Sequence, residues 1–330
     1  MFSFNLRSDG ADVIGKGSRF SPLWSVGARW NPLYETFMHS QSTFSQLALR
    51  ASYGFTGNID RNAYPFGIIT QGNRIYNNNL VAINFQFPNP YITWEKKKDV
   101  NIGVDFGLLN DLITGTFDYY SNKTGDLLGQ EAVPNSYGRT SYTANVSGIA
   151  NRGFDLGLNL NLKFNKDIFW QNSFNIGFNR TRLTRTLYKD IAEAKSYWGG
   201  AYNVQGERYG DIYGQRYAGV DPVSGVGMIW LTAEGKEKYA EIYEIPFSEV
   251  PDKMKMDVSE QTIYLANLTP IANTVPEING GFSSFLKIHD FDFNVFFSYV
   301  LNYDIAIFND ILDVPGNANG NNQLPAGRFN

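Results

Sequence analysis

The sequence predicts an all-β protein, specifically an antiparallel transmembrane β-barrel fragment with long extracellular loops. Three observations indicate this fold class. Apolar and polar side chains alternate along many segments, several of these segments are about nine to eleven residues long, and short connections alternate with long ones. Strands of soluble proteins are mostly about five or six residues long, whereas a tilted strand needs about nine to eleven residues to cross a bilayer.

The expected strands are found from this alternation. In the clearest of them, 153–165, every second residue from Phe154 to Phe164 is apolar, and the residues between them are polar or glycine. In a strand, such a pattern places the apolar side chains on one face and the polar side chains on the other. Nine segments are expected to be strands: 2–8, 23–30, 47–54, 99–108, 112–121, 154–164, 169–180, 280–288 and 291–302.

The connections between these segments are of two kinds. Those that follow Leu109, Phe164 and Ile288 are tight, whereas 54–99, 122–153 and above all 181–279 are long. Loops in compact soluble domains have a median length of about four to six residues. Outer-membrane barrels instead combine short periplasmic turns with long external loops. We therefore expect 181–279 to be the longest external loop.

The two faces of each strand are expected to meet different surroundings. Trp24, Val26, Ala28 and Trp30 would contact lipid, with aromatic side chains near strand ends at the membrane interfaces. The opposite face would line a wet lumen, and its expected residues are Asp105, Asp118, Asn159, Asn161, Asp292 and Asn294. Bacterial single-chain barrels usually have an even number of strands. About nine or ten strands would therefore be part of a larger barrel.

Composition excludes several other classes of protein. The chain has no Cys, which excludes zinc–thiolate sites, and its 2 His leave few residues for a His-rich metal site or a Ser/His/Asp triad. No metal or other cofactor is expected. A net charge of −4 without a long basic run does not support binding of nucleic acid. No run approaches the roughly 18 apolar residues of a membrane-spanning helix. Any contact with a membrane must then be made by strands.

Several stretches point to one family. They include "LRSDGADVIGKGSRFSPLWSVGARW", "LALRASYGFTGN", "ITWEKKKDVNIGVDFGL" and "YGQRYAGVDPVSG". In this order they resemble the SusC/RagA family of TonB-linked outer-membrane transporters of Bacteroidota. The resemblance implies a barrel of about 22 strands with a plugged lumen. It also implies two partners, a SusD-like surface lipoprotein that closes as a lid and a TonB complex that acts through a plug.

The resemblance further implies that 1–330 is one partial barrel domain, with signal peptide, plug and terminal strands absent. The expected function is import of a large polar nutrient, and the chain is not expected to be an enzyme. An oligosaccharide is favoured over an oligopeptide only because the family most often carries glycans. Two alternatives stay open: a passive outer-membrane porin, and a soluble β-rich carbohydrate-binding or glycosidase module.

Candidate substrate-binding residues lie in the longest loop, where "SYWGGAYNVQGERYG" groups aromatic side chains beside flexible glycines. Tyr197, Trp198 and Tyr202 would present flat faces to substrate, with Glu207 or Arg208 adding polar contacts. The same aromatic residues could instead pack against other loops or the lid. No catalytic residue is expected, because a polar row facing the lumen accounts for the carboxylates.

Overall fold

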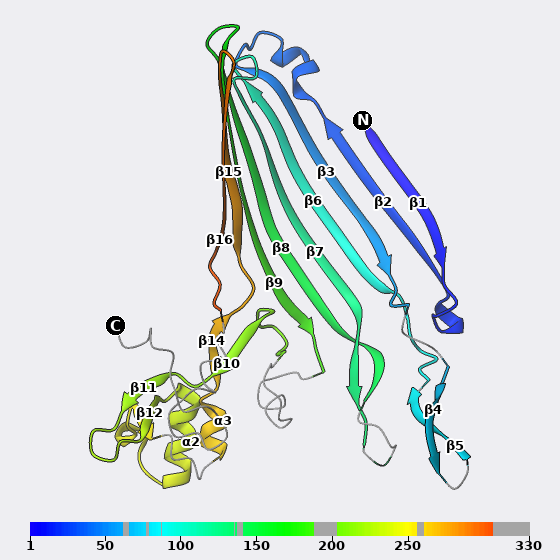
Figure 1. Ribbon diagram of the computed structural model, residues 1–330, viewed down its shortest axis with the longest axis vertical. Helices are drawn as coiled ribbons and strands as arrows, with labels where there is room; N and C mark the ends of the chain where they lie inside the picture. Colours follow the sequence, from blue (N-terminus) through cyan, green and yellow to red (C-terminus); the bar gives the residue numbers. More distant parts are fainter. Residues whose placement is uncertain are drawn as a thin grey trace.

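In the computed structural model, the described residues are 1–61, 66–76, 79–86, 88–134, 136, 141–187, 203–255 and 261–305. Their main feature is a nine-stranded antiparallel sheet in the order β1-β2-β3-β6-β7-β8-β9-β15-β16 (Figure 1). The sheet is not closed: β1 and β16 form its edges. Its strands are β1 (Phe2–Gly10), β2 (Phe20–Trp30), β3 (Phe44–Asn58), β6 (Glu95–Leu108), β7 (Ile113–Ala132), β8 (Ser141–Lys163), β9 (Ile168–Arg185), β15 (Ile278–Ile288) and β16 (Phe291–Leu301).

Each of the nine expected strands corresponds to one strand of this sheet, but the long-loop ends were placed wrongly. The expected loop 122–153 is mostly strand, because β7 and β8 stay paired as far as Ala132 and Ser141. Polar contacts hold this extension, among them Tyr142 Oη donating to Glu131 Oε2 at 2.8 Å. The extension also packs against other parts of the chain, since Leu128 contacts the buried cluster of Ile14, Ile92 and Trp94. Alternation fades there because these contacts replace the contrast between lipid on one face and water on the other.

The short-turn end of the sheet is built from tight turns. Leu109, Asn110 and Asp111 all have positive φ, at 54°, 56° and 63°, between β6 and β7. Ser45 Oγ on the neighbouring β3 holds this turn, since it accepts from the Asp111 N–H at 3.1 Å and donates to Asp111 Oδ1 at 2.6 Å. The β15–β16 turn is the predicted pair at 289–290, with His289 at φ 53°.

The expected loop 181–279 contains a folded unit. It consists of a β10–β14 pair, a β11-β12-β13 sheet and two helices, α2 (Ala233–Tyr243) and α3 (Gln261–Ala266) (Figure 1). Its strands are β10 (Asp211–Gly214), β11 (Tyr217–Val220), β12 (Gly227–Trp230), β13 (Lys253–Lys255) and β14 (Thr269–Asn273). The link 54–99 holds a further hairpin of β4 (Ile68–Tyr76) and β5 (Asn79–Gln86).

Helix α2 was not predicted, although the sequence carries its start signal. Thr232 caps it by accepting a hydrogen bond from the Gly235 N–H at 3.0 Å, and Glu and Lys residues follow. Buried Asn267 then ties the helix to α3: Asn267 Oδ1 accepts from the Thr232 N–H at 2.8 Å, and its amide donates to the Ile263 carbonyl at 2.8 Å. Within the part of the chain that the structure describes, no helix could span a bilayer.

Register divides the large sheet into apolar and polar rows, because residues paired across antiparallel strands share a face. One row crosses all nine strands and is apolar or aromatic throughout. It consists of Phe2, Ala28, Ala51, Ile102, Tyr119, Phe154, Phe178, Ile278 and Leu301. We call the face that carries this row the apolar face, and the opposite one the polar face.

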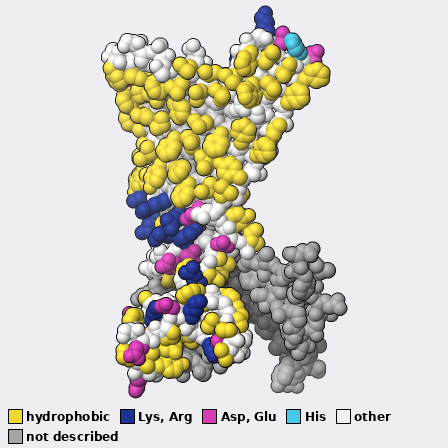
Figure 2. Space-filling view, turned by 90° about the vertical axis from the view of Figure 1, so that its left-hand side faces the viewer, with side chains coloured by type: hydrophobic (Ala, Val, Ile, Leu, Met, Phe, Trp, Pro, Cys, Tyr) yellow, Lys and Arg dark blue, Asp and Glu magenta, His cyan; other side chains and the backbone are white. Residues whose placement is uncertain are grey.

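The apolar face leaves large side chains exposed. Phe4 is 66% exposed, Ile102 53% and Phe297 61%. Hydrophobic side chains cover a continuous area of the molecule (Figure 2). Soluble monomers rarely expose contiguous apolar patches larger than a few hundred Å². Contact with lipid tails accounts for this face.

Candidate functional site

The candidate functional site lies on the polar face, in the row adjacent to the apolar one. This row contains Arg29, Arg50, Gly103, Asp118, Asp155, Gly177 and Asn279. It differs from the apolar row by one residue along each strand. Alternation along each strand and pairing between strands together gather these charges at one level of the wall.

An ion-pair cluster joins four of these strands. Arg50 Nε lies 3.0 Å from each carboxylate oxygen of Asp105, and Arg50 Nη2 lies 2.8 Å from Asp105 Oδ1 and 2.9 Å from Asp118 Oδ2. Arg29 Nη2 adds a longer contact of 3.5 Å to Asp105 Oδ2. Only 15% of the Asp105 side chain is exposed, so hydrogen bonds from the Arg50 guanidinium replace much of the water around the carboxylate.

Gly103 makes room for this cluster. It sits between Arg50 and Asp118 in the row, and a Cβ there would collide with Asp118 Oδ1 and lie 2.8 Å from Arg50 Nη2. Real Cβ atoms do not approach other atoms so closely, so any larger residue would push the ion pair apart. The glycine in "NIGVDF" is thus required by its neighbours on the adjacent strands.

A cavity of about 400 Å³ opens beside the cluster, towards the long-loop end. Tyr120 lies at its edge, and its hydroxyl donates to Asn179 Oδ1 at 3.1 Å while its ring covers Gly153. The cavity combines carboxylates, amides and a phenol, which can donate to and accept from the hydroxyl or amide groups of a polar solute. Its lining residues are Asp99, Val100, Asn101, Tyr120, Asn122, Asn151 and Asp155.

Every residue expected to face the lumen lies on the polar face. Asp105 and Asp118 enter the cluster, whereas Asn159 accepts from Ser173 Oγ at 2.7 Å and Asn161 donates to the Asp111 carbonyl at 3.2 Å. The register places the remaining pair, Asp292 and Asn294, on the same face. Arg50 and Tyr120 were not predicted. The only signal for Arg50 is a lone cation in the strand "LALRASYG".

The expected substrate-binding residues Tyr197, Trp198 and Tyr202 lie outside the described residues. Their polar neighbours are described and have structural contacts. The Glu207 carbonyl accepts from the Leu183 N–H at 3.0 Å, and Arg208 Nη2 lies 3.0 Å from Glu277 Oε1. Arg208 therefore joins the loop to the start of β15.

The stretch "GVDPVSG" forms a turn between β11 and β12, and the Asp221 side chain holds it. The Asp221 carboxylate accepts from the Ser224 N–H at 3.2 Å and lies 2.7 Å from Lys255 Nζ. These hydrogen bonds, above all the one from Lys255, hold the pKa of the Asp221 carboxyl well below its usual range. Within the described part of the chain, no group of three or more His, Cys, Asp or Glu could hold a metal ion.

Comparisons with known proteins agree on one family. The family model described as "TonB dependent receptor-like, beta-barrel" matches residues 1–259. The chain is 26% identical to the TonB-dependent receptor P3 of Formosa agariphila over 324 residues, which cover 92% of this chain and 31% of P3. It is 30% identical to the TonB-dependent receptor SusC of Bacteroides thetaiotaomicron over 213 residues, which cover 58% of this chain and 20% of SusC.

Solved structures of the RagAB peptide importer share the fold. The "closed-closed" state aligns with a TM-score of 0.73 and 24% identity over 91% of this chain and 31% of that chain. The "open-open" state aligns with a TM-score of 0.75 and 23% identity over 96% of this chain and 32% of that chain. The chain thus spans about a third of the length of P3 and of the RagAB chains it matches.

Proposed function

Since the chain belongs to the TonB-dependent receptor β-barrel family, an outer-membrane family and not one of enzymes, we propose that it forms part of the wall of an importer. Its cargo would be a large polar nutrient. The chain would be a single partial barrel domain, 1–330. In support of that extent, β15 and β16 continue the sheet formed by the strands inside 1–259.

The alternation of apolar and polar rows across nine strands is the observation that carries this proposal. The apolar face suits a lipid environment, while the polar face offers charges and hydrogen-bonding groups along the path of a solute. A soluble carbohydrate-binding or glycosidase module does not fit, because its exposed apolar face would meet water. Long strands and a folded unit at the long-loop end suit the external side of such a barrel.

We propose an oligosaccharide as the cargo, as the resemblance to SusC/RagA proteins implies. The carboxylates and amides around the cavity beside Tyr120 can hydrogen-bond sugar hydroxyls, and the aromatic group at Tyr197, Trp198 and Tyr202 would stack on sugar rings. An oligopeptide is the second candidate, because the similar RagAB structures are described as a peptide importer. Backbone amides of a peptide would use the same polar groups.

We also propose two partners, a SusD-like surface lipoprotein at the long-loop end and a TonB complex that acts through a plug. Their support comes from the family and not from residues of this chain. Uptake in cells with and without a functional TonB complex tests this mechanism. Loss of uptake without TonB is expected, whereas undiminished uptake would identify a passive porin.

Binding to the purified full-length transporter tests the substrate. Trp198→Ala should weaken binding of an oligosaccharide by about 1 kcal/mol or more in calorimetry, since central aromatic residues of binding sites lose at least that on truncation. Tyr217→Ala is the control, because Tyr217 is 60% exposed but lies in strand β11. Binding of oligopeptides and not oligosaccharides would reverse the assignment of cargo. Loss of lipoprotein association with unchanged substrate affinity would assign Trp198 to the partner interface.

A further inference from the structure

A row of cations lies on the apolar face where the apolar area ends, at the long-loop end of the sheet. Figure 2 shows Lys and Arg side chains gathered directly beside the hydrophobic area. Strand register identifies the cations of this face, which we call the basic row. It consists of Lys98 on β6, Lys123 on β7, Arg152 on β8, and Arg180 and Arg182 on β9.

Strand pairing shows that the basic row shares the face of the lipid-contacting residues. Arg152 is two residues before Phe154 on β8, and Arg180 is two residues after Phe178 on β9, so they share a face. Lys98 pairs with Lys123, and Arg152 pairs with Arg180. These side chains therefore point outward from the wall, away from the ion-pair cluster on the polar face.

Charge within the described residues does not balance this row. Like charges directly opposite each other destabilise a sheet, and here Lys faces Lys and Arg faces Arg. Arg180 Nε lies 3.5 Å from Glu277 Oε1, but Arg208 is closer to that same oxygen at 3.0 Å. Among the residues that the structure describes, Lys123 and Arg152 have no ion-pair partner. An external anion would relieve this repulsion.

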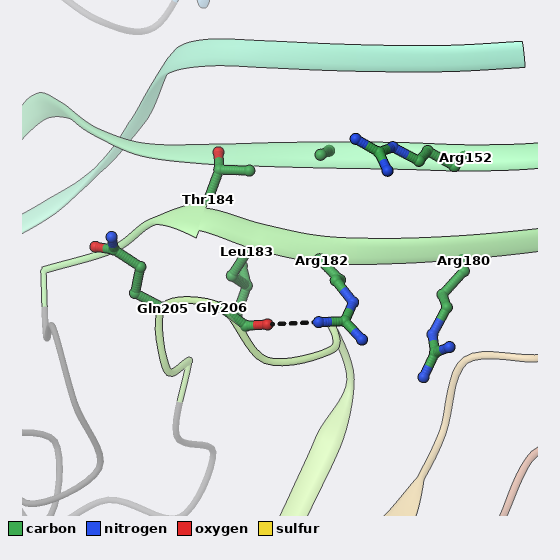
Figure 3. Close-up of a pocket in the computed structure, with 8 residues that line it drawn as sticks. Arg152, Arg180, Arg182, Leu183, Thr184, Gln205 and Gly206 are labelled. Atoms are coloured by element: carbon green, nitrogen blue, oxygen red, sulfur yellow. Dashed lines mark hydrogen bonds between the residues drawn. The ribbon is translucent and has the colours of Figure 1, made fainter.

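A cavity of about 630 Å³ lies against the row, between β9 and the loop segment at Gly206. Arg152, Arg180 and Arg182 line it, and Arg182 Nη1 donates to the Gly206 carbonyl at 3.3 Å (Figure 3). Arginine presents a planar fork of donors that matches phosphate oxygens. Three guanidinium groups beside one cavity thus suit an anion that carries phosphate.

The other end of the same face lacks such a row. The apolar-face positions of the described strands near the tight turns are Leu108, Ile113, Leu162, Ile168, Ile288 and Phe291, none of them charged. Short turns are periplasmic and long loops external in outer-membrane barrels. The basic row therefore lies at the depth of the external headgroups, where cationic side chains can keep their stems in the apolar layer.

We propose that the basic row binds the phosphate groups of a phosphorylated glycolipid in the external leaflet of the outer membrane. The acyl chains would cover the apolar face beside it, and a phosphorylated sugar would occupy the cavity at Arg152, Arg180 and Arg182. This lipid site is separate from the path of the imported substrate, which lies on the polar face.

Native mass spectrometry of the full-length transporter with added diphosphoryl lipid A tests the proposal. The double variant Lys123→Gln/Arg152→Gln removes cations that have no ion pair to lose. Bound lipid should fall about fivefold for each neutralised charge, because a cation near an anionic membrane surface contributes about 1 kcal/mol. Dephosphorylated lipid A should bind the unchanged protein at least as weakly as diphosphoryl lipid A binds the double variant, which keeps three cations of the row.

Lys97→Gln is the matched control, since Lys97 neighbours Lys98 on β6 but points to the other face, where it lies 2.7 Å from Asp99. Its lipid binding should be unchanged. Arg152→Lys keeps the charge and should retain most lipid, which separates loss of charge from misfolding. Equal loss in Lys97→Gln, or full displacement of lipid by inorganic phosphate alone, would overturn the proposal. If the double variant loses association with the lipoprotein but binds lipid as before, the proposal is also overturned, and the basic row contacts a protein partner instead.

Discussion

Leu158 and Asn159 are neighbours in β8, yet their side chains meet opposite surroundings. Leu158 pairs with Gly115 and Phe174 on the apolar face, whereas Asn159 pairs with Thr114 and Ser173 on the polar face. The apolar face gains its stability from lipid, which the protein does not supply. The polar face must satisfy its own groups, as the Asn159–Ser173 hydrogen bond does. A change of the same kind should therefore have different costs on the two faces.

The largest difference is expected for a charge introduced on each face. In the full-length transporter, Leu158→Arg should cost roughly 2 to 4 kcal/mol near the bilayer midplane, because the cation enters hydrocarbon. Asn159→Arg should cost about 1 kcal/mol, the loss of one hydrogen bond, because its new charge points to water. Folding titrations into lipid vesicles measure both. Equal costs would contradict the assignment of the two faces.

The next effect concerns the ion-pair cluster of the polar face. Arg50→Ala should destabilise the wall by roughly 2 kcal/mol, since it leaves the partly buried carboxylates of Asp105 and Asp118 without their shared partner. Arg7→Ala is the control, because its ion pair with Asp9 is exposed and such pairs contribute little. The same folding titration measures the loss of stability in both variants. Similar losses would mean that solvent screens the ion pairs of the cluster as it screens the exposed pair of Arg7 and Asp9.

A smaller effect is expected where the cluster needs space. Gly103→Ala should cost about 1 to 2 kcal/mol, because its Cβ would collide with Asp118 and Arg50. Gly125→Ala is the matched control in β7, since no atom lies within 4 Å of its added Cβ. If Gly103→Ala proves neutral in unfolding experiments, the cluster is looser than the structure indicates.

Two adjacent tyrosines of β7 lie on opposite faces and give a further test of the two faces. Tyr120→Phe should cost about 1 kcal/mol, because the hydroxyl loses its hydrogen bond to Asn179 on the polar face. Tyr119→Phe should be nearly neutral, because Tyr119 is 41% exposed on the apolar face. The measurement is the free energy of unfolding of each variant relative to that of the unchanged protein. A larger cost for Tyr119→Phe than for Tyr120→Phe would contradict the assignment of Tyr119 to the lipid-facing side of β7.

The smallest effect lies outside the wall, at the turn of Asp221. The pKa of the Asp221 carboxyl is lowered in the folded protein. The carboxylate therefore stabilises the turn fully above the unfolded pKa of about 3.9, and this stabilisation is lost as the pH falls through the folded pKa. Limited proteolysis of the β11–β12 turn should therefore show protection between pH 7 and pH 4. Asp221→Asn should be cut faster at pH 7. Equal rates for both proteins would show that the carboxylate does not hold the turn.

Alternation in the sequence was enough to predict the nine strands of the large sheet, their two faces and the tight turns at one end. Alternation is a local property with a period of two, so the neighbours of Leu158 already indicate which side of β8 is apolar. Tight turns at 109–112 and 289–290 could be predicted because they interrupt this alternation for only a few residues. The lumen positions Asp105 and Asp118 followed from the same pattern.

Which of these residues meet depends on the register between strands that are far apart in the sequence. Arg50 is 55 residues from Asp105 and 68 from Asp118, and the basic row joins Lys98 to Arg182 across four strands. Register between strands sets such contacts, and no local period encodes it. The long-loop end was also beyond prediction, because β7 and β8 leave the membrane there and the contrast between lipid and water no longer shapes their sequence.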